Sequence, residues 1–379
     1  MSLPNQGALP MTTALKHTEL TPANAPGLEG IIVANTILSD VDGTKGELLL
    51  RGKSIEALAG HLSFEGAIAH LWQDLVSLPS DDLPRAFGAA RVRAFAGVAA
   101  MQAAPAGLTV FERMRVGLSA LSLPETQIPD VVAISGAMPV LLAAAQRIKE
   151  GLPPIAPDSS LLTAEDLLRM LMGATASVHA IEAVDRYLVT ILDHGLNAST
   201  FTARVIASTQ ADMRDAVIGA MGALKGPLHG GAPGPVLDML DAVGQPENAA
   251  SWVDQELSSG KRLMGFGHRV YRTRDPRADV LKAGLRKLPQ DNPKLVLAEA
   301  VEIAALAALA KAKPDRALDT NVEFYTAVLL DAVGIDRSLF TPLFAVGRTP
   351  GWCAHILEQQ ATGKLIRPAS RYVGPKPSS

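Results

Sequence analysis

The chain has 379 residues, of which 48% are hydrophobic and 19% charged, with a formal net charge of −3. A chain of this length and apolar content is predicted to form about two domains with a large core, and it is not a disordered protein. The slightly acidic balance argues against general attraction to nucleic acid or anionic lipid, so neither is expected as a partner. The single cysteine, Cys353, excludes a disulfide within the chain, disfavours a cysteine-based metal site and fits a cytoplasmic location.

The N-terminal segment has no recognisable targeting signal. Residues 1–27 contain four prolines among scattered threonines and asparagines, which predicts a loosely ordered arm. The segment lacks the basic and continuous apolar regions of a secretory signal. The longest stretch rich in alanine and leucine, near residues 295–310, is interrupted by Glu299 and Glu302. No membrane span is therefore expected.

Residues 29–52 carry the strongest strand signal in the sequence. Two apolar runs, ending at Leu38 and Leu50, flank the pair Asp42-Gly43. An Asp-Gly pair between apolar runs is typical of a tight hairpin turn. This segment is therefore predicted to form a small β-hairpin region.

The rest of the chain follows helical spacing. Ser63 is a good N-cap residue for a helix, and Asn292-Pro293 places a cap residue before a proline suited to the first helical turn. Thr163 with Asp166 three residues later resembles a capping box. Prolines that mark loops between helices lie at positions 124, 129, 153, 154 and 157. The predicted fold class is all-α with a small N-terminal β-hairpin region.

Three of the eight histidines stand out by their neighbours. His229, in Gly-Pro-Leu-His-Gly-Gly-Ala, and His268, in Gly-Phe-Gly-His-Arg-Val-Tyr, are flanked by glycines that let the backbone approach a ligand closely. His194, in Asp-His-Gly-Leu-Asn-Ala-Ser-Thr, has the polar neighbours of a binding loop, although a helix C-terminus explains it equally well. His355 follows Trp352 at helical spacing and is interpreted as a structural histidine.

A basic stretch surrounds His268. Six lysines and arginines between residues 261 and 277 are accompanied by one acid, Asp275. Three interpretations of these residues are open: a solvated basic face, a nucleic-acid surface, or a binding site for carboxylates and phosphates. Sparse aromatic residues weigh against nucleic acid, whereas the planar guanidinium of arginine suits bidentate binding of carboxylates and phosphates. Two more arginines, Arg348 and Arg367, stand in loop-like settings near the C-terminus.

Motifs of several other enzyme classes are absent from the sequence. There is no His-Glu-x-x-His pattern, no Gly-x-Ser-x-Gly elbow and no Walker loop. No metal site is therefore predicted, and hydrolase and nucleotidase functions are disfavoured.

These segments, taken in order, make the chain resemble the citrate synthase family, which includes the 2-methylcitrate synthases. The matches extend over nearly the whole sequence and are specific as a set. They are Val41-Asp42-Gly43 with Leu50-Arg51-Gly52, the segments around His194, His229 and His268 up to Asp275-Pro276-Arg277, Asn321-Val322-Glu323-Phe324-Tyr325, Phe344 to Arg348, Gly351-Trp352 and Arg367-Pro368.

The resemblance implies a homodimer of mainly helical subunits, each with two domains. The large domain would comprise residues 1–229 and 335–379, and the small domain residues 230–334. The active site would lie in the cleft between them, and closure of the cleft would exclude water from the reaction.

The resemblance also implies the chemistry: a Claisen-type condensation of acetyl-CoA with oxaloacetate, then hydrolysis of citryl-CoA to citrate and CoA, as in the tricarboxylic acid cycle. A weak carbon acid needs a base at its methyl group and a donor at its carbonyl oxygen. By resemblance, Glu323 is the catalytic base, His229 donates to the thioester oxygen and His268 polarises the ketone of oxaloacetate. No tightly bound cofactor is expected, because the CoA thioester is a co-substrate.

Substrate-binding residues follow from the same resemblance. The residues that would hold the two carboxylates of oxaloacetate are His194, Arg277, Arg348 and Arg367. Arg367 would be contributed across the interface of the homodimer. Arg272 would face the phosphates of CoA.

Two positions depart from the usual pattern of the family. The base is usually aspartate, and Glu323 adds one methylene, which moves the carboxylate by roughly 1.5 Å. Because a misplacement of about 1 Å can cost on the order of a hundredfold in rate, the backbone is expected to compensate. Gly195 stands where many relatives carry an acid, which alters hydrogen bonding in the loop at His194.

Three functions therefore stay open after the sequence alone. Citrate synthase is favoured over a 2-methylcitrate synthase that uses propionyl-CoA, and over a non-catalytic relative, for which Glu323 is the support. The two enzymes differ by one methylene in the acyl pocket, which is worth about 1–3 kcal/mol of discrimination. The sequence does not display that pocket.

Overall fold

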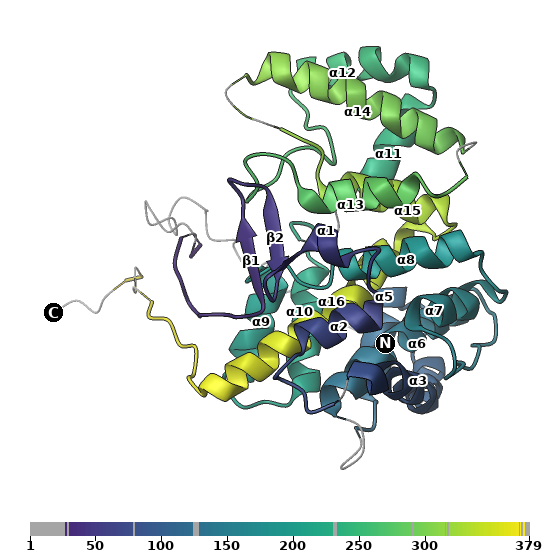
Figure 1. Cartoon of the computed structure of the whole chain (residues 1–379), viewed down its shortest axis with the longest axis vertical. Helices are drawn as coiled ribbons and strands as arrows, with labels where there is room; N and C mark the ends of the chain where they lie inside the picture. Colours follow the sequence, from purple (N-terminus) through teal and green to yellow (C-terminus); the bar gives the residue numbers. More distant parts are fainter. Residues whose placement is uncertain are drawn as a thin grey trace, which may run out of the picture. The chain divides into compact units, whose positions relative to one another are not determined.

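The structure of the chain is a computed structural model (Figure 1) that describes residues 27–28, 30–78, 80–123, 129–229, 233–289, 292–314, 316, 318–370, 372 and 374–375, with the backbone alone at 233 and 362. The arm predicted for residues 1–27 lies, except for its last residue, outside the described residues, as does the Gly-Gly-Ala segment after His229. The chain divides into two compact units. One is Thr36–Ile366, and the other is Met1–Asn35 with Arg367–Ser379.

Helices make up most of the unit Thr36–Ile366. Its strands are β1 (Ser39–Asp42), β2 (Glu47–Leu50) and β3 (Lys53–Ser54). The first ten helices are α1 (Ile55–Leu58), α2 (Phe64–Leu71), α3 (Leu83–Ala94), α4 (Val98–Ala103), α5 (Val110–Ser119), α6 (Asp130–Lys149), α7 (Thr163–Met172), α8 (Val178–Thr190), α9 (Ala198–Ala207) and α10 (Met213–Leu224). The next six are α11 (Pro233–Val243), α12 (Ala249–Ser258), α13 (Pro276–Leu285), α14 (Pro293–Ala312), α15 (Val322–Ala332) and α16 (Phe340–Thr362). Short 3-10 helices are η2 (Ser80–Asp82), η3 (Phe95–Gly97), η4 (Pro246–Asn248) and η5 (Arg337–Leu339).

The predicted hairpin is present and is extended by a third strand. β1 and β2 pair antiparallel with Asp42 opposite Glu47, and β3 pairs antiparallel with β2. The Asp42 carboxylate accepts hydrogen bonds from the backbone N–H groups of Thr44 and Lys45, each at 2.9 Å. This is why aspartate favours the start of a tight turn. The mainly α-helical class with a small β region near the N-terminus is confirmed.

The tip of this hairpin lies against the loop that follows His268. The backbone N–H of Arg272 donates to the carbonyl oxygen of Gly43 at 2.8 Å. A Cβ atom at Gly43 would lie 2.2 Å from the carbonyl oxygen of Val270. Gly43 is therefore needed for a close approach between two backbones.

We expect Gly43→Ala to lower the free energy of unfolding by about 1–3 kcal/mol, because the added methyl forces the hairpin and the loop apart. Gly222→Ala is the matched control, since a Cβ at Gly222 on α10 would meet nothing within 4 Å. There alanine is expected to stabilise the helix by about 1 kcal/mol. Urea denaturation measures both changes. A Gly43→Ala protein as stable as the wild type would contradict the tight contact.

Two helix starts follow the sequence signals. Ser63 caps α2, because its side chain accepts a hydrogen bond from the backbone N–H of Gly66. Asn292 caps α14 by accepting from the backbone N–H of Lys294, and Pro293 is the first helical residue. Both predictions are confirmed.

The capping box predicted at Thr163 and Asp166 is wrong. α7 begins at Thr163 itself, its N-cap residue is Leu162, and the backbone N–H of Thr163 donates to the distant side chain of Glu65 at 2.7 Å. The buried Asp166 carboxylate instead pairs with the buried guanidinium of Arg91, with 2.8 Å between Nε and Oδ2. A buried guanidinium without a carboxylate partner costs several kcal/mol, which is more than a missing helix cap costs. A capping box does occur at Thr109, where a glutamate stands three residues later.

α6 is a core helix that packs against α3, α5, α7 and α16. Residues 131–146 carry no charge, so this uncharged run is longer than any in the alanine- and leucine-rich stretch near residues 295–310. The helix is long and apolar enough to cross a membrane, but 94% of its apolar window is buried inside the protein. A core helix of a soluble protein has the same length and composition, and no other helix in the described part of the chain meets this test.

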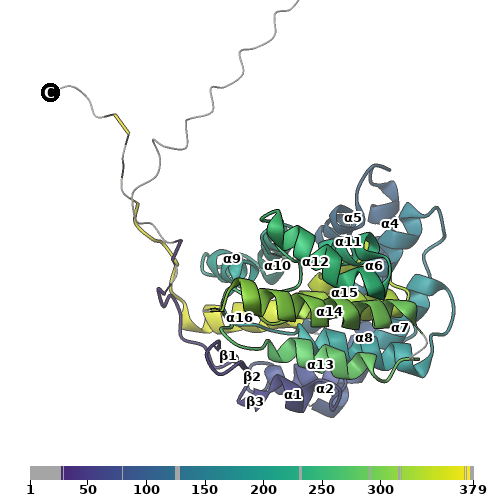
Figure 2. The ribbon, with the colours of Figure 1, turned by 90° about the horizontal axis from the view of Figure 1, so that it is seen from above.

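Helices α11 to α15 pack extensively on one another. α12 lies along α14, and α13 and α11 pack on α15 (Figures 1 and 2). A separate cluster of buried apolar side chains within this region consists of Val253, Leu263, Ala305 and Leu309. Because α13 and α15 also contact α8, the region continues into the rest of the unit. The division at residues 230–334 stays a prediction.

Candidate active site

Arg277, in the first turn of α13, is the centre of a buried charged cluster. Its side chain is only 5% exposed. Its Nε and Nη2 donate to the two oxygens of Asp275 at 3.0 and 2.9 Å. Asp275 also accepts from the backbone N–H of Val322 at 3.1 Å, at the start of α15. The Asp275 carboxylate therefore fixes Arg277 and joins the starts of α13 and α15. Nη1 of Arg277 bonds no described residue and is available to an anionic ligand.

The ring of His268 is a neutral hydrogen-bond donor. Its Nδ1 accepts from the backbone N–H groups of Val270 and Tyr271 at 3.0 and 3.1 Å, so the ring proton lies on Nε2. Nε2 lies 3.3 Å from Nη2 of Arg277, which cannot accept. Burial, and then the charge of Arg277, lowers the pKa of His268 to about 4. At neutral pH the Nε2–H is thus free to donate to a ligand.

His194 lies in the loop between α8 and α9, beside His268. The alternative that it ends a helix is wrong, because α8 ends at Thr190. The rings of His194 and His268 meet edge-on with centroids 5.7 Å apart, and Nε2 of His194 lies 3.1 Å from the hydroxyl of Tyr271. Burial, and then the charges of nearby arginines, holds the pKa of His194 well below its ordinary value.

Arg348 lies within α16, and the loop-like setting predicted from its glycine and proline neighbours is wrong. These glycines allow close packing of the helix. A Cβ at Gly347 would lie 2.6 Å from Cδ1 of Ile191, and one at Gly351 would lie 2.1 Å from the carbonyl oxygen of Leu192. α16 therefore passes very close to the loop that follows α8.

The guanidinium of Arg348 is buried and makes no ion pair with any residue the structure describes. Its Nε donates to the carbonyl oxygen of Ile191 at 2.6 Å, and its Cζ lies 4.8 Å from the centroid of the Phe344 ring. Burial lowers the pKa of Arg348 to about 10, with Asp193 opposing the shift, so the side chain stays charged at neutral pH. A buried cation without a paired carboxylate indicates a site for an anionic ligand.

Glu323 is the carboxylate of this cluster, in the first turn of α15. The helix is capped by Asn321, whose side-chain oxygen accepts from the backbone N–H of Glu323 at 3.0 Å. The Glu323 carboxylate itself bonds no residue in the described ranges. Burial raises its pKa to about 7, and Arg277 and Arg348 limit the rise. A carboxyl with this pKa is suited to act as a base near neutral pH.

His229, in the loop after α10, is held by Ser199. Its Nε2 lies 2.8 Å from the Ser199 hydroxyl oxygen and 3.3 Å from the Ser199 backbone N–H, which points at it. The same hydroxyl oxygen accepts from Nε1 of Trp352 at 3.1 Å. Burial, and then the charge of Arg348, lowers the pKa of His229 to about 4. Its Nδ1 has no partner among the described side chains.

The structure brings six of the eight predicted site residues into one cluster through direct contacts or electrostatic interactions. They are His194, His229, His268, Arg277, Glu323 and Arg348. Arg272 is exposed on the loop after His268 and forms no ion pair with a described residue. Arg367 belongs to the other compact unit, where it is exposed outside any helix or strand. Its predicted position across a dimer interface stays a prediction.

Three residues of the cluster were missed as site residues by the sequence analysis. Asp275 had a usable signal, because an acid before a proline at a helix start is a common N-cap arrangement. Tyr271 packs on His268 with ring centroids 4.8 Å apart, and nothing in its spacing indicated that contact. Ser199 bonds His229, which lies on a different loop, so no local pattern could reveal it.

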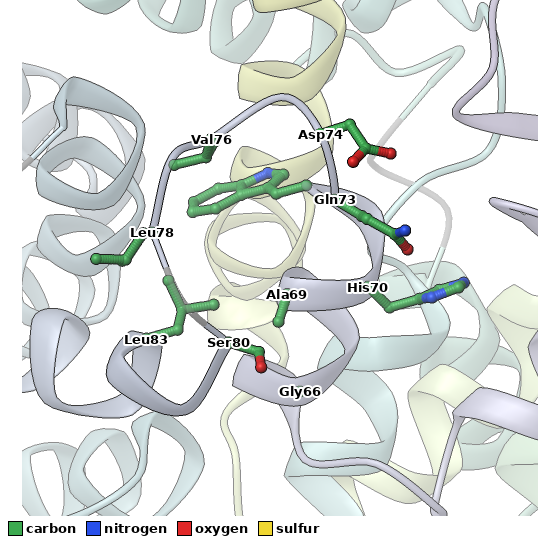
Figure 3. A pocket seen from close by; sticks show the side chains of 10 residues that line it. Gly66, Ala69, His70, Gln73, Asp74, Val76, Leu78, Ser80 and Leu83 are labelled. Carbon is green, nitrogen blue, oxygen red and sulfur yellow. The ribbon is translucent and has the colours of Figure 1, made fainter.

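A separate cavity of about 420 Å³ lies between α2 and the segment that follows it (Figure 3). Its lining includes His70, Trp72 and Asp74, and none of the predicted site residues. It has no buried arginine and no unpaired carboxylate, so the histidine–arginine cluster is the better candidate for chemistry. No group of histidine, cysteine and acidic side chains suited to a metal ion occurs within the described ranges.

Comparison with known proteins gives consistent results over nearly the whole chain. Residues 27–369 match the family described as "Citrate synthase, C-terminal domain". A putative citrate synthase 2 of Mycobacterium tuberculosis is 42% identical over 365 residues, covering 93% of this chain and 94% of that protein. The citrate synthase of Haloferax volcanii is 37% identical over 368 residues, covering 92% and 96%. A 2-methylcitrate synthase of M. tuberculosis is 34% identical over 362 residues, covering 92% and 90%.

Solved structures share the fold. The citrate synthase of Thermotoga maritima has a TM-score of 0.82 at 33% identity, covering 93% of this chain and 97% of that one. The citrate synthase of Thermoplasma acidophilum, in a ternary complex with carboxymethyl coenzyme A and oxaloacetate, has a TM-score of 0.81 at 28% identity, covering 93% and 97%. The fold is the mainly helical fold of these enzymes. The chain belongs to the citrate synthase family.

Proposed function

We propose that this protein is a citrate synthase, which condenses acetyl-CoA with oxaloacetate and hydrolyses citryl-CoA to citrate and CoA. The observation that carries the proposal is the unpaired carboxyl of Glu323, with a pKa near 7, in the field of two buried arginines. Neutral histidines complete the cluster. Such a set can hold a dianion, polarise a ketone and remove a proton from a weak carbon acid.

Oxaloacetate would bind at the arginines. The buried guanidinium of Arg348 and the free Nη1 of Arg277 are donors for the two carboxylates, and His194 adds a neutral donor. The Nε2–H of His268 would donate to the ketone oxygen and stabilise the negative charge that develops there during attack. Arg367 of the partner subunit would complete the carboxylate site in a homodimer.

Acetyl-CoA would react between Glu323 and His229. The Glu323 carboxylate takes a proton from the methyl group, and His229 donates to the thioester oxygen of the resulting enol. The methylene carbon then forms a bond to the ketone carbon of oxaloacetate, and water later cleaves the thioester. A donor role needs the ring proton on Nδ1, and the Ser199 N–H that points at Nε2 supports this tautomer.

The setting of the reaction is part of the same proposal. A small domain of residues 230–334 would close on a large domain and exclude water while the enol exists. Arg272, exposed and without an ion-pair partner among the described residues, would meet the phosphates of CoA. A cytoplasmic location is proposed from the single cysteine, and a role in the tricarboxylic acid cycle from the proposed activity.

Release of free thiol from acetyl-CoA and from propionyl-CoA, each with and without oxaloacetate, tests the proposal. We expect oxaloacetate-dependent release with a higher kcat/KM for acetyl-CoA. The alternative is a 2-methylcitrate synthase, as in the M. tuberculosis relative of that name, and equal or better efficiency with propionyl-CoA would establish it. No release with either thioester would indicate a non-catalytic relative.

The pH dependence of kcat/KM is expected to follow Glu323. Its pKa is about 7 and the base acts as the carboxylate, so log(kcat/KM) should fall by one for each pH unit below about 7 and level off above it. His229 and His268, with pKa values of about 4, stay neutral over this range. Initial rates in buffers of constant ionic strength measure the profile. A flat profile between about pH 5 and 8 would contradict the assignment.

A further inference from the structure

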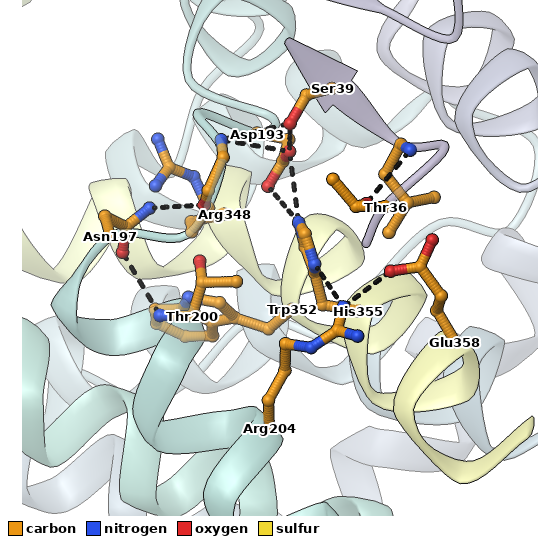
Figure 4. Close-up of polar contacts among 12 residues, drawn as sticks. Thr36, Ser39, Asp193, Asn197, Thr200, Arg204, Arg348, Trp352, His355 and Glu358 are labelled. Carbon is orange, nitrogen blue, oxygen red and sulfur yellow. Dashed lines mark hydrogen bonds and ion pairs between the residues drawn. The ribbon is translucent and has the colours of Figure 1, made fainter. Parts of the chain in front are cut away.

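A group of buried polar side chains surrounds Asp193, the residue that precedes His194 (Figure 4). Asp193 precedes His194 in the chain, Arg204 comes from α9, and His355 and Glu358 come from α16. The side chains of Asp193 and His355 are fully buried. The sequence indicated only a structural role for His355, and no step of the proposed reaction uses it.

Hydrogen bonds fix the position of the ring proton on His355. Nη1 of Arg204 lies 3.0 Å from Nδ1 of the ring, and a guanidinium only donates, so Nδ1 is the acceptor. The ring proton therefore lies on Nε2. Nε2 in turn lies 3.2 Å from Oδ1 and 3.3 Å from Oδ2 of Asp193. His355 is thus a neutral donor that is held from one side by Arg204 and directed at Asp193 on the other.

The charge of Arg204 is offset by Glu358, with 2.6 Å between Nη1 and Oε2. Oε1 of Glu358 accepts from the backbone N–H of Ile37 at 2.9 Å, so this pair is also tied to the segment before β1. No lysine or arginine among the described residues contacts the carboxylate of Asp193 directly. Its negative charge is therefore not neutralised by Arg204 and is available to the other buried guanidinium of the region.

Asp193 is an anion that supports two site residues. Burial would raise its pKa, but His355, Arg348 and Ser39 outweigh burial and hold the pKa below its ordinary value. Its Oδ2 accepts from the Ser39 hydroxyl and from the backbone N–H of Gly195, the latter at 3.3 Å. Gly195 has a φ of 59°, which glycine adopts readily, and its N–H also donates to the Ser39 hydroxyl oxygen at 3.0 Å, so Asp193 restrains this backbone both directly and through Ser39. Asp193 is also the main charge that favours the protonated form of buried Arg348.

We propose that His355 is a positioning residue for the oxaloacetate site. By holding the Asp193 carboxylate, it keeps the backbone around His194 in place and keeps a negative charge near Arg348. Both residues would receive the carboxylates of the substrate. The identity of that ligand rests on the proposed function, whereas the restraint on the loop does not.

The test compares His355→Leu, His355→Gln and Asp193→Asn with the wild type. Leucine removes both hydrogen bonds of the ring. Glutamine keeps an N–H donor for Asp193 and an oxygen acceptor for Arg204, and asparagine at position 193 keeps the size of the side chain but not its charge. His70→Gln is the matched control, since Nε2 of His70 on α2 bonds a backbone oxygen, that of Leu50, at 2.9 Å.

Calorimetry without acyl-CoA gives the Kd of oxaloacetate, and initial rates give the two KM values. We expect His355→Leu and Asp193→Asn to weaken oxaloacetate binding by about tenfold or more, the scale of one lost hydrogen bond to a charged group. The KM for acetyl-CoA should stay within about twofold, and His355→Gln should recover most of the affinity. Amide hydrogen exchange at Gly195, measured without substrate, should be faster in His355→Leu and Asp193→Asn than in the wild type. Exchange in α10 should not change.

Each outcome separates the positioning role from the proposed function. If the wild type binds oxaloacetate and all three variants bind it equally well, the positioning role is wrong. It is also wrong if His355→Gln loses as much affinity as His355→Leu, because the hydrogen bonds then do not matter. If the wild type binds no oxaloacetate but exchange at Gly195 rises in Asp193→Asn, the proposed function fails and the restraint on the loop stands. If the wild type binds no oxaloacetate and exchange at Gly195 does not rise in Asp193→Asn, both fail.

Discussion

Glu323→Gln is expected to lower kcat by about a thousandfold, within the range of about 10² to 10⁴ for a general base, and to leave oxaloacetate binding within about threefold of the wild type. The amide keeps the shape of the side chain but cannot take a proton. Because the carboxylate bonds no described residue in the free protein, its loss breaks no hydrogen bond of the fold. Steady-state rates of thiol release and calorimetry with oxaloacetate measure the two effects separately.

Glu323→Asp is the informative companion of this variant. It retains a carboxylate but withdraws it by roughly 1.5 Å, one carbon–carbon bond. If the backbone at the start of α15 has adapted to glutamate, this variant should lose on the order of a hundredfold in kcat and keep the same dependence on pH. Full activity of Glu323→Gln would remove Glu323 from the role of base.

Arg348→Met is expected to weaken oxaloacetate binding by about 30-fold to several thousandfold, equivalent to about 2–5 kcal/mol for loss of one partner of a buried charge pair. The same change should lower the free energy of unfolding far less than the loss of a buried ion pair would, because the guanidinium makes no ion pair within the described residues and its removal breaks one hydrogen bond, to Ile191, and takes away a charge near Asp193. Calorimetry measures the binding, and urea denaturation without ligand measures the stability.

Arg91→Met provides the matched control. Arg91 is also buried, but its Nε pairs with Asp166 at 2.8 Å, and none of its contacts reaches the histidine cluster. Its loss removes the buried partner of Asp166, which retains only the partly exposed Arg169 at 2.6 Å, and also breaks the bond to Thr163. The expected result is a loss of about 3–5 kcal/mol of stability. Oxaloacetate affinity should not change in protein that remains folded. Equal stability losses in the two variants would contradict a ligand-binding role for Arg348.

Local signals in the sequence were enough to predict the hairpin and several helix starts. The Asp42-Gly43 turn and the caps at Ser63 and Asn292 depend on hydrogen bonds within a few residues, so short patterns reveal them. Arg348 shows where this approach fails. Glycine and proline around it indicated a loop, but Gly347 and Gly351 are explained by the close packing of α16 on a distant loop. Such packing is a tertiary effect that no local pattern encodes.

The candidate site was predicted better by resemblance than by local pattern. His229 and His268 could be selected from their glycine-rich surroundings alone, and the family motif added Glu323 and the arginines. Of the side chains that orient them, Asp275 could be found from its N-cap position, but Ser199 and His355 could not. Ser199 bonds a histidine on another loop, and His355 has only the spacing of a helical residue in the sequence, whereas the structure places it against Asp193.

The contact between Gly43 and the loop at Val270 also bears on how the chain is synthesised and folds. The hairpin leaves the ribosome early, but the backbone against which its tip packs is made only after most of the chain. A small hairpin is at best marginally stable by itself, and pairings between distant segments form slowly. The tip of the hairpin must therefore wait for its packing partner, and truncation anywhere before α13 should leave a fragment with exposed apolar surface that is prone to aggregate.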